Sequence, residues 1–345
     1  MKAAVVHGVN DIRIEEYPTP GAGEGEVVVR TRVSGICATD IKTLLGLGLP
    51  KDLPTILGHE VVGEIAELGP GVQGLQVGER VAVYPIAVCG TCRYCRAGRH
   101  NLCEAEFGLG HGIEGGFAEY VRLPRQIVEN GGVVRLEDDF SYEDAVFAEP
   151  LSCTLAAARA CRLEPGRDVL IIGAGPMGLM HLKMARHHGC RVLIADLLEA
   201  RLALAEKMGA DEVIDSKTEN LPERVRELTG GRGADAVIIS LGIPQVIEES
   251  LKLTAKGGVC NIFGGPPPSE IRLDPRWLHY LEITLTGTFA STPGLFRESL
   301  ELIRTGAITV SDLLSHRFSL DSFLEAVDKA RNQEMVRGVV LFDEQ

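Results

Sequence analysis

The stretch that most constrains the fold runs from residue 168 to residue 289. Short apolar segments, which we expect to be strands, alternate there with segments of helical pattern. The expected strands are residues 168–172, 191–196, 212–215, 234–240, 258–263 and 283–289, and expected helices include 177–188 and 199–208. This alternation is typical of a parallel sheet with helices on both faces. The sequence therefore predicts an α/β fold with a doubly wound (Rossmann) domain.

The first of these strands runs into the hexapeptide GAGPMG at residues 173–178. A lone glycine pattern of this kind is weak evidence, and a turn without function is the alternative. Here it follows an apolar strand and opens a helix. Gly173 would make the tight turn, Gly175 would let the backbone approach a pyrophosphate, and Gly178 would let helix and strand pack closely. The hexapeptide thus predicts a dinucleotide site.

The helix after this turn begins with Pro176 and Met177, and its free N–H groups would face the phosphates. Asp196 ends the next strand, where its carboxylate would accept ribose hydroxyls and repel a 2′-phosphate. We therefore expect NAD rather than NADP as the cofactor. Arg201 lies within reach of the adenosine end and leaves NADP open.

Four of the nine cysteines lie close together in the chain. Cys89, Cys92 and Cys95 are spaced by two residues, and Cys103 follows after seven more. Four thiolates can surround one tetrahedral Zn²⁺ and close it to substrate. A redox pair or two disulfides would be the alternatives, but clustered cysteines in a cytosolic chain indicate a metal first. The spacing predicts a structural zinc.

His59 and Glu60 form a second candidate metal site, flanked by Gly58 and Gly63. Glycines weaken a strand, and a charged side chain inside a core needs a partner, so this is a poor core segment. We consider the pair together with Cys37 upstream and Glu149 downstream. Imidazole, thiolate and carboxylate are donors that Zn²⁺ takes when one position stays open for chemistry. A surface His–Glu pair is the alternative.

The flanking segments, residues 1–149 and 291–345, are expected to form one β-rich, barrel-like domain, with residues 150–290 inserted as the nucleotide domain. At 345 residues the chain exceeds what one core usually supports. Short apolar runs separated by Gly and Pro turns indicate strands rather than βαβ units. The expected strands are residues 3–7, 12–15, 26–34, 61–68, 80–83 and 338–342, with helices at 151–160, 295–305 and 320–333.

The composition excludes some partners. The net charge of −13 with scattered cations argues against nucleic acid, which needs a basic face. No apolar run approaches the roughly 20 residues that span a bilayer, and the N-terminus lacks a signal peptide. We therefore expect a cytoplasmic protein with no membrane partner.

Together these motifs resemble the zinc-containing medium-chain alcohol dehydrogenases along the whole chain, and within them the polyol (sorbitol-like) and threonine dehydrogenase branch. The resemblance rests on the segments 35–40 (GICATD), 58–60 (GHE) and 149–152 (EPLS), on the four cysteines and on the glycine turn. It implies that the β-rich domain is GroES-like and carries the catalytic zinc. It also implies a homodimer or homotetramer.

The resemblance assigns the zinc ligands. Cys37 and His59 match two ligands, and either Glu60 or Glu149 would supply the carboxylate, a choice that the sequence leaves open. Asp40 matches a carboxylate that orients the histidine.

The resemblance also suggests roles outside the ligand set. Thr39 matches the hydroxyl that passes the substrate proton to solvent, and Arg337 matches an arginine that contacts cofactor phosphates. Lys42 is a departure, because relatives often have a relay histidine there. A lysine could meet an anionic substrate, or it could be a solvated surface residue.

The implied reaction is oxidation of a secondary alcohol, a polyol, cyclitol or sugar derivative, with the ketone reduced in reverse. Zn²⁺ would lower the pKa of the alcohol so that an alkoxide forms, and hydride would pass to the nicotinamide of NAD. One alternative is amino-alcohol oxidation of the L-threonine 3-dehydrogenase kind. A remote alternative is a non-catalytic nucleotide-binding relative.

Overall fold

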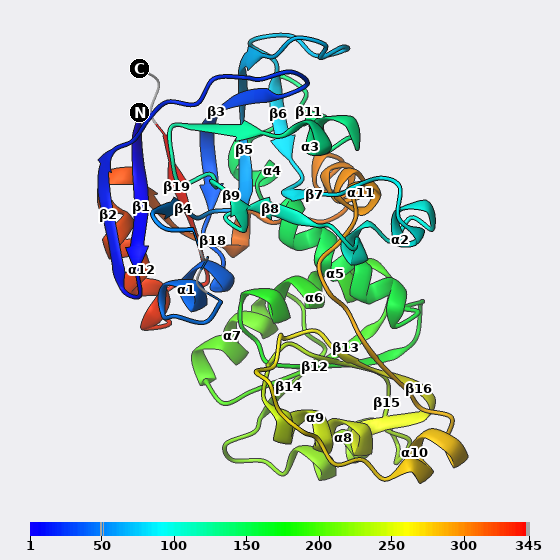
Figure 1. The fold of residues 1–345 in the computed structure, drawn as a ribbon. Coiled ribbons are helices and arrows are strands. Elements are labelled where there is room, and N and C mark those ends of the chain that lie inside the picture. The colour runs from blue at the N-terminus through cyan, green and yellow to red at the C-terminus, as the bar shows by residue number, and fades with distance from the viewer. Residues whose placement is uncertain (49, 51, 343–345) are drawn as a thin grey trace. The chain divides into compact units, whose positions relative to one another are not determined.

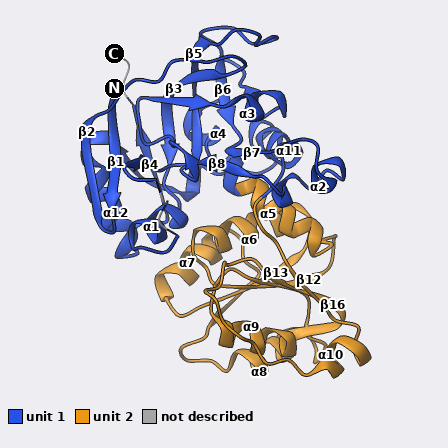
Figure 2. Cartoon of the chain, viewed as in Figure 1, with its two compact units in different colours: residues 1–150, 291–345 blue, residues 151–290 orange. Residues whose placement is uncertain are grey.

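The computed structural model describes residues 1–48, 50 and 52–342. The chain folds as two compact units, coloured separately in Figure 2. Unit 1 contains Met1–Pro150 and Ser291–Gln345, and unit 2 contains Leu151–Ala290. These ranges differ from the predicted domains only in the assignment of Pro150.

Unit 2 is built on a six-stranded sheet of order β14-β13-β12-β15-β16-β17 (Figure 1). Every neighbouring pair is parallel, which confirms the predicted doubly wound sheet. Its strands are β12 (Asp168–Ile172), β13 (Arg191–Asp196), β14 (Glu212–Asp215), β15 (Ala234–Ile239), β16 (Thr254–Ile262) and β17 (Thr284–Gly287). Its helical segments are α5 (Ala148–Ala160), whose first three residues belong to unit 1, α6 (Pro176–His187), α7 (Glu199–Lys207), α8 (Leu221–Leu228), α9 (Pro244–Ser250), η2 (Leu251–Leu253) and α10 (Pro275–Tyr280).

The buried strand β12 begins the nucleotide-type turn in unit 2. All five of its residues are buried, as expected for a strand covered on both faces. A Cβ at Gly178 would lie 1.8 Å from the carbonyl oxygen of Gly173, so only glycine lets α6 approach β12 this closely. The strand order reverses between β12 and β15, which is where sheets of this type bind ligands.

Unit 1 is β-rich, as predicted. Its largest sheet has seven strands in the order β11-β6-β5-β3-β19-β18, with β10 also paired to β3, and two three-stranded sheets have the orders β2-β1-β4 and β7-β8-β9. The strands are β1 (Lys2–Gly8), β2 (Asp11–Glu16), β3 (Val27–Gly35), β4 (Thr55–Ile56), β5 (Glu60–Leu68), β6 (Arg80–Val83), β7 (Ile86–Ala87), β8 (Phe107–Leu109), β9 (Gly112–Ile113), β10 (Tyr120–Leu123), β11 (Val133–Arg135), β18 (Leu314–Ser319) and β19 (Arg337–Leu341).

The helical segments of unit 1 are short. They are α1 (Ala38–Leu44), α2 (Arg93–Arg96), η1 (His100–Leu102), α3 (Arg125–Glu129), α4 (Tyr142–Ala145), α11 (Pro293–Arg304), η3 (Ser311–Leu313), η4 (Leu320–Ser322) and α12 (Phe323–Arg331). The expected helix at residues 320–333 is therefore split between η4 and α12. Among the described residues, no helix combines the length and apolar composition that crossing a bilayer requires.

The C-terminal strand β19 connects the last segment of the chain to the first sheet of unit 1. It pairs antiparallel with β3 and parallel with β18. This pairing brings Arg337, the first residue of β19, to the end of β3 where the Cys37 segment begins.

Candidate active site and metal centres

Cys37 lies at the N-terminus of α1, directly after β3. Its backbone is extended, with φ −99° and ψ 150°, as is usual for the residue that caps a helix. The carboxylate of Asp40 accepts a hydrogen bond of 2.9 Å from the backbone N–H of Cys37. Because this bond fixes the first turn of α1, it also fixes the position of the thiol.

His59 precedes β5 and faces the same carboxylate. Its Nδ1 lies 3.4 Å from Oδ1 of Asp40, whose side chain is only 4% exposed. Burial alone would lower the pKa of His59, but the charges of Asp40 and Cys37 outweigh it, so the pKa lies well above its ordinary value. The surroundings of the imidazole therefore favour a positive charge.

Glu60 is fully buried and has one oxygen paired and one oxygen free. It lies opposite Gly35 in the β3–β5 ladder, where a Cβ on residue 35 would come within 2.0 Å of the Glu60 carboxylate. Oε2 of Glu60 pairs with the guanidinium of Arg337. Oε1 has no hydrogen-bond partner among residues 1–48, 50 and 52–342. An unpaired buried carboxylate oxygen is costly, so this atom is suited to a cation.

One ligand atom each from Cys37, His59 and Glu60 lies within 4.8 Å of the others, and we call these three residues the Cys37 cluster. Sulfur, nitrogen and oxygen donors with a free carboxylate oxygen fit a zinc ion that keeps one open position. Glu149, in the first turn of α5, is outside this group as the structure describes it. The structure thus brings Glu60 against Cys37 and His59.

Arg337 has different contacts from those that the resemblance suggested. Its side chain is 5% exposed, it pairs with Glu60, and its guanidinium carbon lies 5.6 Å from the centre of the Phe147 ring. Burial would lower the pKa of Arg337, but the charge of Glu60 outweighs this and raises it, with Glu149 adding to the effect. Contact with cofactor phosphates stays a prediction. No sequence signal linked Arg337 to Glu60, because the pair spans 277 positions.

The four clustered cysteines also converge, and we call them the cysteine lobe. Their sulfur atoms all lie within 4.8 Å of one another, and all four are free thiols. Cys89 Sγ is 3.5 Å from Cys103 Sγ and 4.0 Å from Cys95 Sγ. Sulfurs about 3.8 Å apart are what a tetrahedron with Zn–S bonds of about 2.3 Å requires. Backbone N–H groups of Thr91 and Cys92 lower the pKa of Cys89 to about 6, which favours the thiolate.

In unit 2, Asp196 supports the glycine turn as well as ending β13. Its Oδ2 accepts the N–H of Ala174 at 2.7 Å, and its Oδ1 accepts the N–H of Leu197 at 2.7 Å. Arg201 Nη1 lies 3.8 Å from Asp196 Oδ2. Oδ1 also accepts the N–H of Leu198 at 3.0 Å. The sequence missed this backbone role, which fixes the carboxylate at the C-terminal end of β13 and leaves Oδ2 as the oxygen with more capacity for a hydroxyl donor.

Two exposed side chains follow Cys37 on α1. Thr39 and Lys42 are three residues apart, so they lie on the same side of the helix. The side chain of Lys42 makes no ion pair within the described part of the chain.

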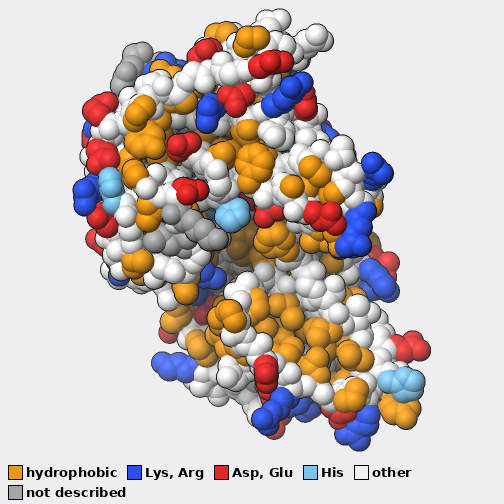
Figure 3. Space-filling view, in the orientation of Figure 1, with side chains coloured by type: hydrophobic (Ala, Val, Ile, Leu, Met, Phe, Trp, Pro, Cys, Tyr) orange, Lys and Arg blue, Asp and Glu red, His pale blue; other side chains and the backbone are white. Residues whose placement is uncertain are grey.

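The exposed face shown in Figure 3 carries both signs of charge interspersed, with no basic stripe.

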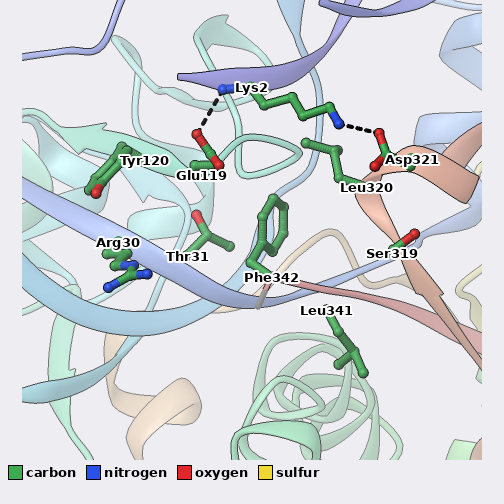
Figure 4. Close-up of a pocket in the computed structure, with 10 residues that line it drawn as sticks. All are labelled: Lys2, Arg30, Thr31, Glu119, Tyr120, Ser319, Leu320, Asp321, Leu341 and Phe342. Carbon is green, nitrogen blue, oxygen red and sulfur yellow. Dashed lines mark hydrogen bonds and ion pairs between the residues drawn. The ribbon is translucent and has the colours of Figure 1, made fainter. Parts of the chain in front are cut away.

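A separate hollow of about 160 Å³ lies elsewhere in unit 1 (Figure 4). Three of its charged side chains already have partners, because Lys2 pairs with Asp321 through its amine and donates its backbone N–H to Glu119 at 2.8 Å. None of the predicted ligand or cofactor residues lines it. We therefore do not assign the function to this hollow.

Comparisons with known proteins agree with the two units. A model of the alcohol dehydrogenase GroES-like domain matches residues 23–138, and a model of zinc-binding dehydrogenases matches residues 176–305. Among solved structures, the alcohol dehydrogenase TADH from Thermus sp. ATN1 is similar, with a TM-score of 0.93, 28% identity and 99% of each chain covered. A putative zinc-binding dehydrogenase from Sinorhizobium meliloti 1021 bound to NADP has a TM-score of 0.92 and 29% identity, with 99% of each chain covered.

Relatives of known name cover almost the whole chain. Sorbitol dehydrogenase of Bacillus subtilis is 32% identical over 96% of this chain and 93% of the relative. D-arabitol-phosphate dehydrogenase of Enterococcus avium is 31% identical over 96% and 94%. L-threonine 3-dehydrogenase of Idiomarina loihiensis is 33% identical over 94% of each. The chain, a Rossmann unit joined to a GroES-like unit, therefore belongs to the zinc-dependent medium-chain alcohol dehydrogenases, an oxidoreductase family, in the branch of the polyol and threonine dehydrogenases.

Proposed function

We propose that this protein oxidises a secondary alcohol, a polyol, cyclitol or sugar derivative, with NAD as the hydride acceptor, and catalyses the reverse reduction of the ketone. The observation that carries this proposal is the Cys37 cluster. Its three donor atoms lie within 4.8 Å of one another, and Oε1 of Glu60 has no hydrogen-bond partner in the described chain, which leaves it free to bind a cation.

In this proposal the chain's own residues hold the metal and manage the proton. A bound Zn²⁺ would supply Lewis acidity to the substrate oxygen. Asp40 orients the imidazole of His59, and Arg337 holds the second oxygen of Glu60, which leaves Oε1 available for the ion. Thr39, which is exposed in the first turn of α1, would accept the substrate proton and pass it to solvent.

Glu149 has a secondary place in this scheme. Its charge acts on Arg337, which is also the partner of Glu60. Glu149 would therefore compete for the same guanidinium, or supply a carboxylate ligand when Glu60 withdraws.

For the cofactor, we propose that Gly173, Gly175 and Gly178 shape the pyrophosphate turn. Pro176 and Met177 open α6, whose N-terminal N–H groups would meet the phosphates.

Asp196 would accept the adenosine ribose hydroxyls, which favours NAD. Arg201 is the cation nearest to Asp196, and a similar structure is bound to NADP. Paired Michaelis constants for NAD and NADP would test the preference, and equal constants would contradict it.

The cysteine lobe is proposed to bind a second, structural zinc, held by Cys89, Cys92, Cys95 and Cys103. Its donors are all thiols, so the ion would keep no open position for substrate. Two zinc ions per folded chain are therefore expected.

The substrate class is supported by the relatives, which include enzymes named for sorbitol and for D-arabitol phosphate. Lys42 adds a specific observation, because an unpaired cation one turn from Thr39 is suited to a phosphate or carboxylate on the substrate. L-threonine oxidation is the second candidate, supported by the threonine dehydrogenase relative.

The test is a screen for NADH formation with sorbitol, galactitol, their phosphates, a cyclitol and L-threonine, at fixed zinc. We expect the highest kcat/KM with a polyol or polyol phosphate. A preference for threonine would favour the second candidate. No turnover with any alcohol, with only one zinc ion per chain, would instead support the non-catalytic alternative.

We also propose a homodimer or homotetramer in the cytoplasm. The edge strand β17 (sequence TLTG) carries no charge and no proline, so a second copy could pair with it. All nine cysteines are free thiols, which fits a reducing compartment. Light scattering after size-exclusion chromatography checks the assembly, and a monomer at micromolar concentration would contradict it.

A further inference from the structure

His181 is a buried titratable residue of unit 2 that the proposed reaction does not use. It lies in α6 and is 1% exposed. Its ring meets the ring of Phe263 edge-on, with centroids 4.3 Å apart and an interplanar angle of 88°. Nε2 of His181 has no hydrogen-bond partner within the residues described here.

Two more unpaired polar atoms, Ser240 Oγ and Asn261 Oδ1, lie on the face of the sheet that α6 covers. Ile171, Ile238 and Asn261 are in register across β12, β15 and β16, so their side chains share one face. A Cβ at Gly178 would lie 3.6 Å from Ile171 Cγ2, so this is the face that α6 covers.

Ser240 follows Ile238 by two positions and therefore continues the same face, as Phe263 does after Asn261. Oγ of Ser240 and Oδ1 of Asn261 are buried and also lack a partner in the described chain. Asn261 donates its Nδ2–H to Oγ1 of Thr288 at 2.8 Å, which connects β16 to the residue after β17.

None of the three atoms, His181 Nε2, Ser240 Oγ and Asn261 Oδ1, has a hydrogen-bond partner in the described chain, the other two included. Burial lowers the pKa of His181 to about 3, so the imidazole is neutral at working pH. Buried water molecules typically make about three hydrogen bonds to polar groups that lack other partners. The three atoms come from α6, from the residue after β15 and from β16, and they are the kind of buried groups that such a water satisfies.

The positions of His181, Ser240 and Asn261 relate them to the nicotinamide half of the cofactor. A dinucleotide crosses a doubly wound sheet at the point where the strand order reverses, here between β12 and β15. The glycine turn and Asp196 follow β12 and β13, so the adenosine half belongs on that side. The nicotinamide half then belongs at the ends of β15, β16 and β17, where Ser240, Phe263 and Thr288 follow their strands.

We propose that His181, Ser240 and Asn261 bind ordered water in a buried polar network, and that this network positions the chain at the ends of β15, β16 and β17 for the nicotinamide half of the cofactor. This inference rests on the proposed NAD dependence. His181 is a positioning residue, because it acts through these strand ends rather than by touching the substrate.

The test compares NAD with ADP, which contains only the adenosine half. In His181→Met the dissociation constant for NAD is expected to rise about tenfold, while that for ADP changes less than twofold. The KM for NAD should rise more than kcat falls. His181→Gln places an amide near the position of Nε2 and should bring the NAD constant back to within about threefold of the wild type.

Ser299→Ala is the matched control, because Ser299 Oγ is likewise buried and unpaired in the described chain but lies in unit 1. It should change neither constant. If His181→Met fails to fold, Asn261→Leu carries the same test. Unchanged NAD binding in a folded variant, or equal weakening of NAD and ADP, overturns the proposal. A wild type that binds ADP but not NAD would instead defeat the proposed cofactor.

A high-resolution crystal structure is a second, independent check. We expect an ordered water within hydrogen-bond distance of His181 Nε2. If no water occupies that position and the ring nitrogen is still unpaired, the proposed network is wrong.

Discussion

The two candidate metal centres of unit 1 differ in how they are assembled. The cysteine lobe takes all its donors from one short segment, and local backbone N–H groups meet its sulfurs, as Cys92 N–H does to Cys89 Sγ at 3.3 Å. The Cys37 cluster takes its donors from the end of β3 and the start of β5. It also depends on Arg337 from β19 and on Asp40 from α1.

This difference explains how one chain can hold a closed ion and an open one. Four cysteine sulfurs satisfy a tetrahedral ion and leave no position for substrate. The Cys37 cluster has three unlike donors, and its carboxylate shares its charge with a buried guanidinium. Loss of the ion from the cysteine lobe should therefore lower stability, and loss of the ion from the Cys37 cluster should lower activity.

The largest effect is expected from Cys37→Ser. Loss of metal polarisation is worth several kcal/mol, so kcat/KM should fall by about 10⁴-fold. The NAD dissociation constant and the thermal midpoint should hardly change, and bound zinc should fall by one ion per chain. Steady-state kinetics and metal analysis check this. A variant that keeps full activity would remove the distinction between the two centres.

Arg337→Met tests whether the guanidinium stabilises Glu60. It leaves a buried carboxylate unpaired, so the free energy of unfolding should fall by about 3–5 kcal/mol. Arg337→Lys keeps the charge and should lose less. Denaturant titrations of both variants measure this, and equal stability of Arg337→Met and the wild type would show that the pair is dispensable.

Cys103→Ser should give the opposite pattern to Cys37→Ser. It removes one thiolate of the closed ion, so the free energy of unfolding should fall by about 2 kcal/mol or more. Turnover per folded molecule should stay close to that of the wild type. Calorimetry with active-site titration separates the two quantities, and a selective loss of kcat without destabilisation would contradict the structural role.

Asp40→Asn should affect only the Cys37 cluster. The amide still caps α1 but no longer offers a charge to His59, so zinc affinity there should fall about 10- to 100-fold. Competition with a chromogenic chelator measures this, and the zinc of the cysteine lobe is the internal control. Equal loss from both centres would point to a general destabilisation.

The smallest effect is expected from Lys42→Met. Exposed ion pairs contribute at most about 1 kcal/mol, so the preference for a polyol phosphate over the free polyol should fall about two- to fivefold. Thr39 and the metal ligands are untouched, so turnover of the uncharged polyol should not change. An unaltered ratio would make Lys42 a solvated surface residue.

Much of the fold followed from the sequence. The bounds expected for β6, β12, β13 and β14 are those of the structure, because the apolar residues of these strands are bounded by charged or turn-forming residues. Short strands such as β4, β7 and β9, with two residues each, were missed. Two residues carry no periodicity, so only their pairing partners define them.

The candidate site also has parts that the sequence predicted and parts that it did not. Local spacing was enough to predict the cysteine lobe and the glycine turn, because the atoms concerned are close in the chain. The roles of both stay predictions, but the proximity of the four cysteine sulfurs is now observed. The partner of Arg337 and the unpaired atoms of His181 and Asn261 had no sequence signal, since each depends on which strands lie side by side.

By itself, the sequence determined which residue types were available and where the backbone could turn. Glycines at 173, 175 and 178 and cysteines at 89, 92, 95 and 103 act over short chain distances, where covalent geometry limits the possible arrangements. The tertiary structure decided which charges share a buried space. A buried polar atom has no water to bind, so its hydrogen bonds and ion pairs depend on its nearest neighbours. Arg337 is the neighbour of Glu60 because β19 pairs with β3.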